Sequence, residues 1–204
     1  HVIDNGKVYP SQKMVDVIQG IQPPTSVKLV QTFVGMCGYF ALYIPMMAHY
    51  RGQLTSLTKD GVVWNDKTWT AEHQEAFDKI KSLLKSACVY LIDWDLPVIL
   101  VTDASGTALG GCLMQKSAPE QLPTSEASSK SAKATSAGTD GYYKPLRYMS
   151  RSLDKFEQMQ ENREREMRAG LYCMMKCNSV LANNLFTWIM DHANIQWVMK
   201  TKAE

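Results

Sequence analysis

Long apolar runs, a disulfide framework and a strong net charge are all missing from this chain of 204 residues. No apolar segment approaches the roughly 20 residues that a membrane-spanning helix needs, so we expect no membrane span. The five cysteines are an odd and scattered set, which favours an intracellular, reducing compartment (cytoplasm, nucleus or organelle) over a disulfide-bonded one. The formal net charge is +2, whereas a dedicated nucleic-acid binder usually carries a clear basic excess. Whole-chain charge therefore gives no support for tight binding of RNA or DNA.

A zinc site is also unsupported. Cys173 and Cys177 stand one helical turn apart and can present two sulfurs to a metal ion. No second cysteine pair and no nearby histidine completes a ligand set, so we interpret both as thiols of the hydrophobic core.

Large apolar residues are nearly absent from residues 116–141, which are rich in Ser, Ala, Lys, Thr and Pro. Such a segment cannot bury enough surface to order itself, and we interpret it as a flexible surface insertion. The rest of the chain has an ordinary globular composition, with 45% hydrophobic and 21% charged residues.

The first half of the chain is predicted to be mainly helical. Residues 1–9 predict a hairpin around Asn5-Gly6, a dipeptide that suits a primed turn. Helices are expected after Ser11, after Thr25 or Ser26, and from about Thr70, because apolar residues there recur at helical spacing.

The second half predicts a sheet with helices, and therefore an α/β (α+β) fold class. Leu96–Thr102 reads as a buried strand that leads into Asp103. An antiparallel neighbour is expected at Ala108–Met114, where Gly110 and Gly111 allow close backbone approach. Further elements are expected as a strand at Leu146–Met149, a helix from Asp154 to about Met175, a strand at Leu185–Met190 leading into Asp191, and a short helix at Ile195–Met199.

Three acidic residues are candidates for a metal site because of their positions. Asp103 and Asp191 end predicted strands, and Glu166 lies early in a predicted helix. Acids at the ends of strands can meet at one edge of a sheet, and a helix packed there can add a third. Clustered carboxylates repel one another unless a cation neutralises them, which points to Mg²⁺. From spacing alone, acids facing solvent at strand ends remain the simpler explanation.

Short motifs around these acids resemble the ribonuclease H region of gypsy-type (LTR) retrotransposon reverse transcriptases. The motifs are Thr102-Asp103-Ala104-Ser105 followed by Gly110 and Leu113-Met114-Gln115, then Tyr148-Met149-Ser150-Arg151-Ser152-Leu153, Glu164-Arg165-Glu166-Met167-Arg168-Ala169, and Asp191-His192. The resemblance implies that Asp103, Glu166 and Asp191 are catalytic, metal-binding carboxylates. His192 would be a weaker catalytic candidate, and we prefer to interpret it as a surface histidine at a strand end.

The resemblance extends to the N-terminal half and implies a domain organisation. Residues 1–22 resemble the end of a polymerase palm, residues 23–95 a helical thumb and connection region, and residues 96–204 a ribonuclease H-like domain truncated at its C-terminus. The paired aspartates of the palm would precede His1, so no polymerase activity is expected of this chain.

Several features depart from the family's pattern. Val30-Gln31 and Ala41-Leu42 stand where relatives usually carry arginines that plausibly touch a nucleic-acid backbone. Gly170 interrupts the helix of Glu166 at a cost of about 1 kcal/mol relative to alanine. The family also continues well beyond the position of Glu204, through a final helix that supplies a fourth carboxylate. Trp188 and Trp197 near this edge suggest apolar surface covered by a partner.

These features leave three functional hypotheses open. We favour a catalytically lapsed, domesticated retroelement protein, retained as a structural subunit that binds other proteins of a larger assembly. The alternative is an active Mg²⁺-dependent ribonuclease H that cuts the RNA strand of RNA–DNA hybrids. A weaker alternative is a non-catalytic RNA-binding module.

Overall fold

A hairpin at the N-terminus is tied to a strand that follows the helices. The computed structural model describes residues 1–117, 142–182 and 184–191. In it β1 (Val2–Asp4) pairs antiparallel with β2 (Lys7–Tyr9), and β2 pairs with β3 (Val89–Tyr90). Asn5 and Gly6 both have a positive φ, 47° and 73°, as a primed two-residue turn requires. The predicted hairpin is confirmed, whereas β3 was not predicted.

Helices fill the chain between the hairpin and β3. They are α1 (Gln12–Gly20), α2 (Val27–Gly38), α3 (Met47–Thr55), the 3₁₀ turn η1 (Ser56–Thr58) and α4 (Ala71–Lys85). Ser26 caps α2, because its side chain accepts a hydrogen bond from the backbone N–H of Leu29. The rings of Phe33 and Phe77, 4.5 Å apart, lie in the core between these helices. The sequence predicted α1, α2 and α4 but not α3.

The second half of the chain forms a mixed four-stranded sheet in the order β6-β5-β4-β7. Strand β5 pairs antiparallel with β4 and β6, and β7 pairs parallel with β4. The elements are β4 (Val98–Ala104), β5 (Ala108–Ser117), β6 (Tyr142–Ser152), α5 (Lys155–Gln158), α6 (Asn162–Lys176), α7 (Asn178–Leu181) and β7 (Phe186–Ile189). The predicted fold class is confirmed: a mixed α/β arrangement with a helical N-terminal segment.

Element bounds differ from the predictions in several places. Asp103 lies inside β4, paired with Gly110, instead of following the strand. Lys116 and Ser117 belong to β5, so the ordered strand reaches into the segment predicted as an insertion. β6 is much longer than its predicted core. Residues 118–141 and the helix expected at Ile195–Met199 lie outside the described residues.

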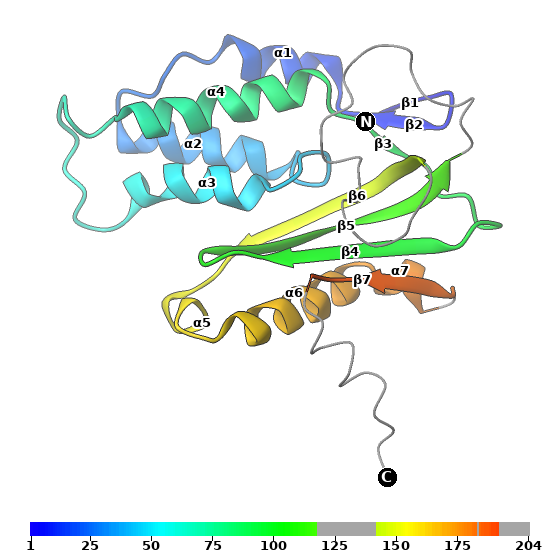
Figure 1. Ribbon diagram of the computed structural model, residues 1–204. Helices are drawn as coiled ribbons and strands as arrows, with labels where there is room; N and C mark the ends of the chain where they lie inside the picture. Colours follow the sequence, from blue (N-terminus) through cyan, green and yellow to red (C-terminus); the bar gives the residue numbers. More distant parts are fainter. Residues whose placement is uncertain (118–141, 183, 192–204) are drawn as a thin grey trace.

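Helices cover the two faces of the sheet (Figure 1): α6 and α7 lie against one face, and the N-terminal helices lie on the other side. Leu100 and Leu113 of the sheet are buried with Cys173 and Cys177 of the α6 segment. Both cysteines are free, which confirms their interpretation as core thiols. The close approach predicted at the paired glycines is also confirmed, since a Cβ on Gly111 would lie 2.9 Å from the sulfur of Cys173.

The helical segment joins the sheet through hydrogen bonds to β6, one of them between backbones and two through serine hydroxyls. Tyr148 N donates to the carbonyl of Leu42 at 2.9 Å, and Ala48 N donates to Ser150 Oγ at 2.9 Å. Ser152 Oγ donates to the carbonyl of Ala48 at 3.4 Å. The two bonds of Ala48 place the start of α3 beside the C-terminal end of β6. Among the described residues, no helix has the length and apolar character needed to cross a membrane.

Candidate metal-binding carboxylate site

Asp103 and Asp191 reach the same edge of the sheet because β4 and β7 run parallel. Val101 of β4 is in register with Ile189 of β7, and each aspartate lies two residues beyond this pair. Both aspartates are exposed. The sheet therefore brings together two of the acids that the sequence singled out.

Glu166 is the third acid, and α6 carries it to this edge of the sheet in a buried position. It is the fifth residue of α6 and is only 3% exposed. Its Oε1 accepts a hydrogen bond from the backbone N–H of Ala104, the residue after Asp103, at 3.3 Å. Its Oε2 is buried and has no hydrogen-bond partner.

The electrostatics of Glu166 show that the three acids interact. Burial raises the pKa of Glu166 above its ordinary value, and the carboxylates of Asp103 and Asp191 raise it further. The Ala104 N–H and the charge of Arg165 act in the opposite direction but do not cancel this effect. A cation placed among the three carboxylates would relieve both the burial and the repulsion.

The three carboxylates are ligands of the chemical type that binds a hard divalent cation. Carboxylate oxygens are ligands that Mg²⁺ prefers, and the unpartnered Oε2 of Glu166 has an unused acceptor position. In this conformation, the described residues contain no group of three or more His, Cys, Asp or Glu side chains arranged to hold a metal ion. His192 lies outside the described residues, so its role stays a prediction. The metal-binding role of Asp103, Glu166 and Asp191 also stays a prediction.

Asp103 also borders a cavity on the face of the sheet that α3 approaches. The cavity has a volume of about 220 Å³, and its lining is mostly apolar, with Val101, Cys112 and Met149 among its residues. His49 and Ser150 add polar groups to the lining. The region beside Asp103 on this face is therefore hollowed but largely apolar.

Trp188 joins the three elements that carry the acids, a contact that the sequence did not predict. That a partner covers surface near Trp188 stays a prediction, and Trp197 lies outside the described residues. The indole is partly buried against α6, and its Nε1 donates to Thr102 Oγ1 of β4 at 2.9 Å. The six-membered ring occupies the space beside Gly170, where no Cβ would fit. The helical glycine that seemed unfavourable in the sequence is thus required for packing.

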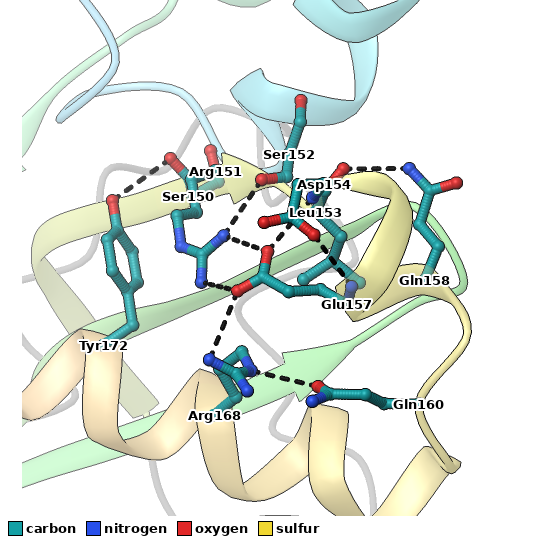
Figure 2. A network of polar contacts seen from close by, with 10 residues as sticks. All are labelled: Ser150, Arg151, Ser152, Leu153, Asp154, Glu157, Gln158, Gln160, Arg168 and Tyr172. Atoms are coloured by element: carbon teal, nitrogen blue, oxygen red, sulfur yellow. Dashed lines mark hydrogen bonds and ion pairs between the residues drawn. The ribbon is translucent and has the colours of Figure 1, made fainter.

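A partly buried ion-pair network holds the N-terminal part of α6 to the end of β6 (Figure 2). The carboxylate of Glu157 accepts hydrogen bonds from both terminal nitrogens of Arg151, at 2.6 and 2.7 Å. Arg168 of α6 approaches the same carboxylate to 3.3 Å from the other side. Hydrogen bonding from Arg151 lowers the pKa of Glu157 to about 2, and the Asp154 N–H and the charges of Arg151 and Arg168 add to this effect.

The network extends from Arg151 to an aromatic ring of α6. The Arg151 guanidinium lies 5.5 Å from the centre of the Tyr172 ring, and the Tyr172 hydroxyl donates to the carbonyl of Ser150 at 3.4 Å. Two turns of α6 are thereby fixed to the end of β6. The charged residues are visible in the sequence, but the sequence did not predict that Arg168 pairs with Glu157.

This sheet, with acidic residues delivered by β4, by α6 and by the end of β7, defines a ribonuclease H-like domain. Residues 93–204 match the family described as the RNase H-like domain found in reverse transcriptase, and the chain belongs to this family. The broader part of the predicted resemblance is thereby confirmed.

Retroviral and transposon polyproteins are among the relatives of the chain. It is 33% identical over 131 residues to the Gag-Pol polyprotein of Woolly monkey sarcoma virus, a match covering 64% of this chain and 8% of the relative. It is 26% identical over 203 residues to the retrovirus-related Pol polyprotein from transposon 297 of Drosophila melanogaster, covering 99% of this chain and 16% of the relative. The chain thus spans a small part of these polyproteins. Because both retroviral and transposon proteins match, a gypsy-type origin in particular stays a prediction.

Solved structures share the fold over most of the chain. The foamy viral protease-reverse transcriptase dRH in complex with ds DNA has a TM-score of 0.67 and 18% identity, covering 95% of this chain and 30% of that chain. The foamy viral protease-reverse transcriptase in complex with RNA/DNA hybrid has a TM-score of 0.66 and 18% identity, covering 94% of this chain and 23% of that chain. At this identity, the likeness establishes the fold alone.

Proposed function

We propose that this chain is the ribonuclease H-like part of a retroelement reverse transcriptase and that it hydrolyses the RNA strand of RNA–DNA hybrids with a divalent cation. The observation that carries the proposal is the buried, unpartnered Oε2 of Glu166 beside the acids Asp103 and Asp191. A buried carboxylate near two like charges is unfavourable without a cation, so this arrangement is better explained by metal binding than by stability. One solved structure of the same fold is a complex with RNA/DNA hybrid, which supports the choice of substrate.

The three acids would hold the ion, with Asp103 and Asp191 provided by the sheet and Glu166 by α6. Bound Mg²⁺ would activate water for attack on a phosphodiester and stabilise the charge on the leaving oxygen. Glu166 would be held in place by the Ala104 N–H at its Oε1, which leaves Oε2 for the ion. The exposure of both aspartates leaves this edge of the sheet accessible to a polynucleotide.

The first test is cleavage of a labelled RNA–DNA hybrid in the presence of Mg²⁺ or Mn²⁺. We expect the native chain to cut the RNA strand and Asp103→Asn to lose roughly a hundredfold or more of this activity, as groups that stabilise transition-state charge commonly do. The matched control is Asp60→Asn, which removes an exposed carboxylate in the turn after η1 and should cleave like the native chain. Absence of cleavage by well-folded native protein, or equal cleavage by Asp103→Asn, would contradict the proposal.

The structural-subunit hypothesis is a second candidate that one observation favours. Leu171 and Met175 of α6 and Leu185 before β7 are exposed by 55%, 78% and 92%. Large apolar side chains so exposed are often covered by another protein in an assembly. In this case the chain would act through protein partners, and neither Asp103→Asn nor Glu166→Gln would change its activity in its biological context.

A further inference from the structure

The indole of Trp188 sits in a notch on α6 that exists because residue 170 is glycine. A Cβ added at Gly170 would lie 2.0 Å from Cζ2 and 2.6 Å from Cη2 of Trp188, far inside van der Waals contact. Gly170 itself is buried. Alanine at position 170 would stabilise the helix by about 1 kcal/mol relative to glycine. Glycine lacks this stabilisation but allows α6 to approach β7 closely.

The same indole is also fixed to β4 by a hydrogen bond. Its Nε1 donates to Thr102 Oγ1 at 2.9 Å, and Thr102 is only 2% exposed. An indole N–H that is partly buried usually finds an acceptor, and this bond fixes the direction in which the ring points. One side chain thus contacts α6 through its six-membered ring and β4 through its nitrogen.

Each residue of this contact is close in sequence to one of the three acids. Thr102 directly precedes Asp103 on β4, and Gly170 follows Glu166 by about one turn of α6. Trp188 lies on β7, whose end leads to Asp191. Among the described strands β7 lies at the edge of the sheet and pairs with β4 through four residues, so contact with α6 adds a restraint beyond this pairing.

We propose that Trp188 is a positioning residue that sets the spacing of Asp103, Glu166 and Asp191 by locking β4, α6 and β7 together at the Gly170 notch. This inference rests on the proposed function, since it assumes that the three acids bind a divalent cation. The motifs that carry the family resemblance include neither Trp188 nor Gly170, so the resemblance does not assign this role.

The test measures Mn²⁺ affinity by electron paramagnetic resonance for the native chain and for variants of the notch. Gly170→Ala forces the indole away and should weaken Mn²⁺ binding by about tenfold or more, the usual effect of changing the residues that orient metal ligands. Trp188→Phe loses the bond to Thr102 and should also weaken binding. The double variant Gly170→Ala/Trp188→Phe should bind more tightly than Gly170→Ala, because the shorter ring of phenylalanine makes room for the added methyl group.

A second readout and a control separate positioning from simple loss of stability. Nuclear magnetic resonance should show a Trp188 indole proton protected from exchange in the native chain and exposed in Gly170→Ala. Leu84→Ala removes a buried side chain from the helical segment, away from α6. It should lower the unfolding temperature without changing Mn²⁺ affinity.

The possible outcomes distinguish the inference from the proposed function. Native Mn²⁺ affinity in Gly170→Ala would overturn the positioning role alone. A lack of rescue in the double variant would do the same, because the steric clash would then not be the cause. A folded native chain that binds no Mn²⁺ would overturn the proposed metal site and the positioning role together.

Discussion

Glu166 is a buried carboxylate whose surroundings oppose the stability of the folded chain. It is buried among two other acids, and its Oε2 has no hydrogen-bond partner. Without a cation, the folded state contains a charge that would be better solvated in the unfolded chain.

Glu166→Gln should therefore stabilise the chain at pH 7 when divalent cations are removed. The amide keeps an acceptor for the Ala104 N–H and loses the repulsion, so the free energy of unfolding should rise by roughly 1 kcal/mol. Urea unfolding in EDTA measures this. Adding Mn²⁺ should then stabilise the native chain but not the variant. Lower stability of the variant in EDTA would contradict the argument.

At the level of single residues, the sequence singled out the three acids but not the side chains that contact the elements carrying them. Asp103, Glu166 and Asp191 could be proposed as site residues because each stands within a short motif of a recognisable order, and their role stays a prediction. The contact of Trp188 with Gly170 and Thr102 could not be predicted, since it joins three elements far apart in the sequence. Gly170 stood out in the sequence because glycine is unfavourable inside a helix. The reason for a glycine there, its packing against Trp188, could be found only in the structure.

The element that positions Glu166 is α6, and Glu157 anchors that helix to β6. The Glu157 carboxylate is bound by Arg151 on one side and Arg168 on the other. It also accepts a hydrogen bond from the backbone N–H of Asp154, whose side chain caps α5 in return. A neutral residue at 157 would leave two guanidinium groups without their shared counter-ion.

Glu157→Gln should destabilise the chain by about 2 kcal/mol at pH 7, the usual size for loss of charged hydrogen bonds. The folded-state pKa of about 2 lies below the ordinary 4.5, so the carboxylate stabilises the fold above about pH 4.5. That contribution is lost as the pH falls from 4.5 towards 2. Thermal unfolding across this range should therefore show the native chain and the variant converging.

The matched control for this anchor is Glu161→Gln. Glu161 is exposed and its ion pair with Arg163 is 3.8 Å long, so the change should affect the unfolding temperature little at any pH. A constant difference between the native chain and Glu157→Gln from pH 7 to pH 2 would show that Glu157 does not act through its charge.

Elements with strong local patterns were predicted better than those that depend on distant partners. β4 and β5 follow from their apolar runs, and α2 and α4 from helical spacing after a capping residue. α3 was missed because its apolar residues show little helical periodicity and it is held in place by β6. β3 has only two residues, too few for a local pattern, and it forms by pairing with the edge of β2.

Across the whole molecule, the helical segment and the sheet are joined at β6. Ser150 accepts the backbone N–H of Ala48 at the start of α3. Ser150→Ala leaves this partly buried donor unpaired and should lower the free energy of unfolding by about 1 to 2 kcal/mol. Denaturant unfolding measures the loss.

The matched control for the junction is Thr32→Ala on α2. The hydroxyl of Thr32 is exposed and donates to the carbonyl of Lys28 one turn earlier, a local bond that alanine's helix propensity offsets. We expect a change within about 0.5 kcal/mol. Equal effects at the two positions would show that the contact between Ser150 and Ala48 does not hold the two parts together.

The structure contains connections between distant parts of the chain that the sequence did not predict. β2 pairs with β3 across all the N-terminal helices, and Tyr148 of β6 packs against the helical core. The domain bounds at residues 22 and 95 stay predictions.

The parallel pairing of β7 with β4 has a consequence for the order in which the chain matures during synthesis. β4 is made early, but its parallel neighbour is made only after β5, β6 and three helices have followed. Pairing of such distant strands is slow compared with local hairpins and helices. A ribosome-bound chain would therefore hold Asp103 and Glu166 without Asp191 for some time, and any capacity to attack nucleic acid would arise only when synthesis of the sheet is finished.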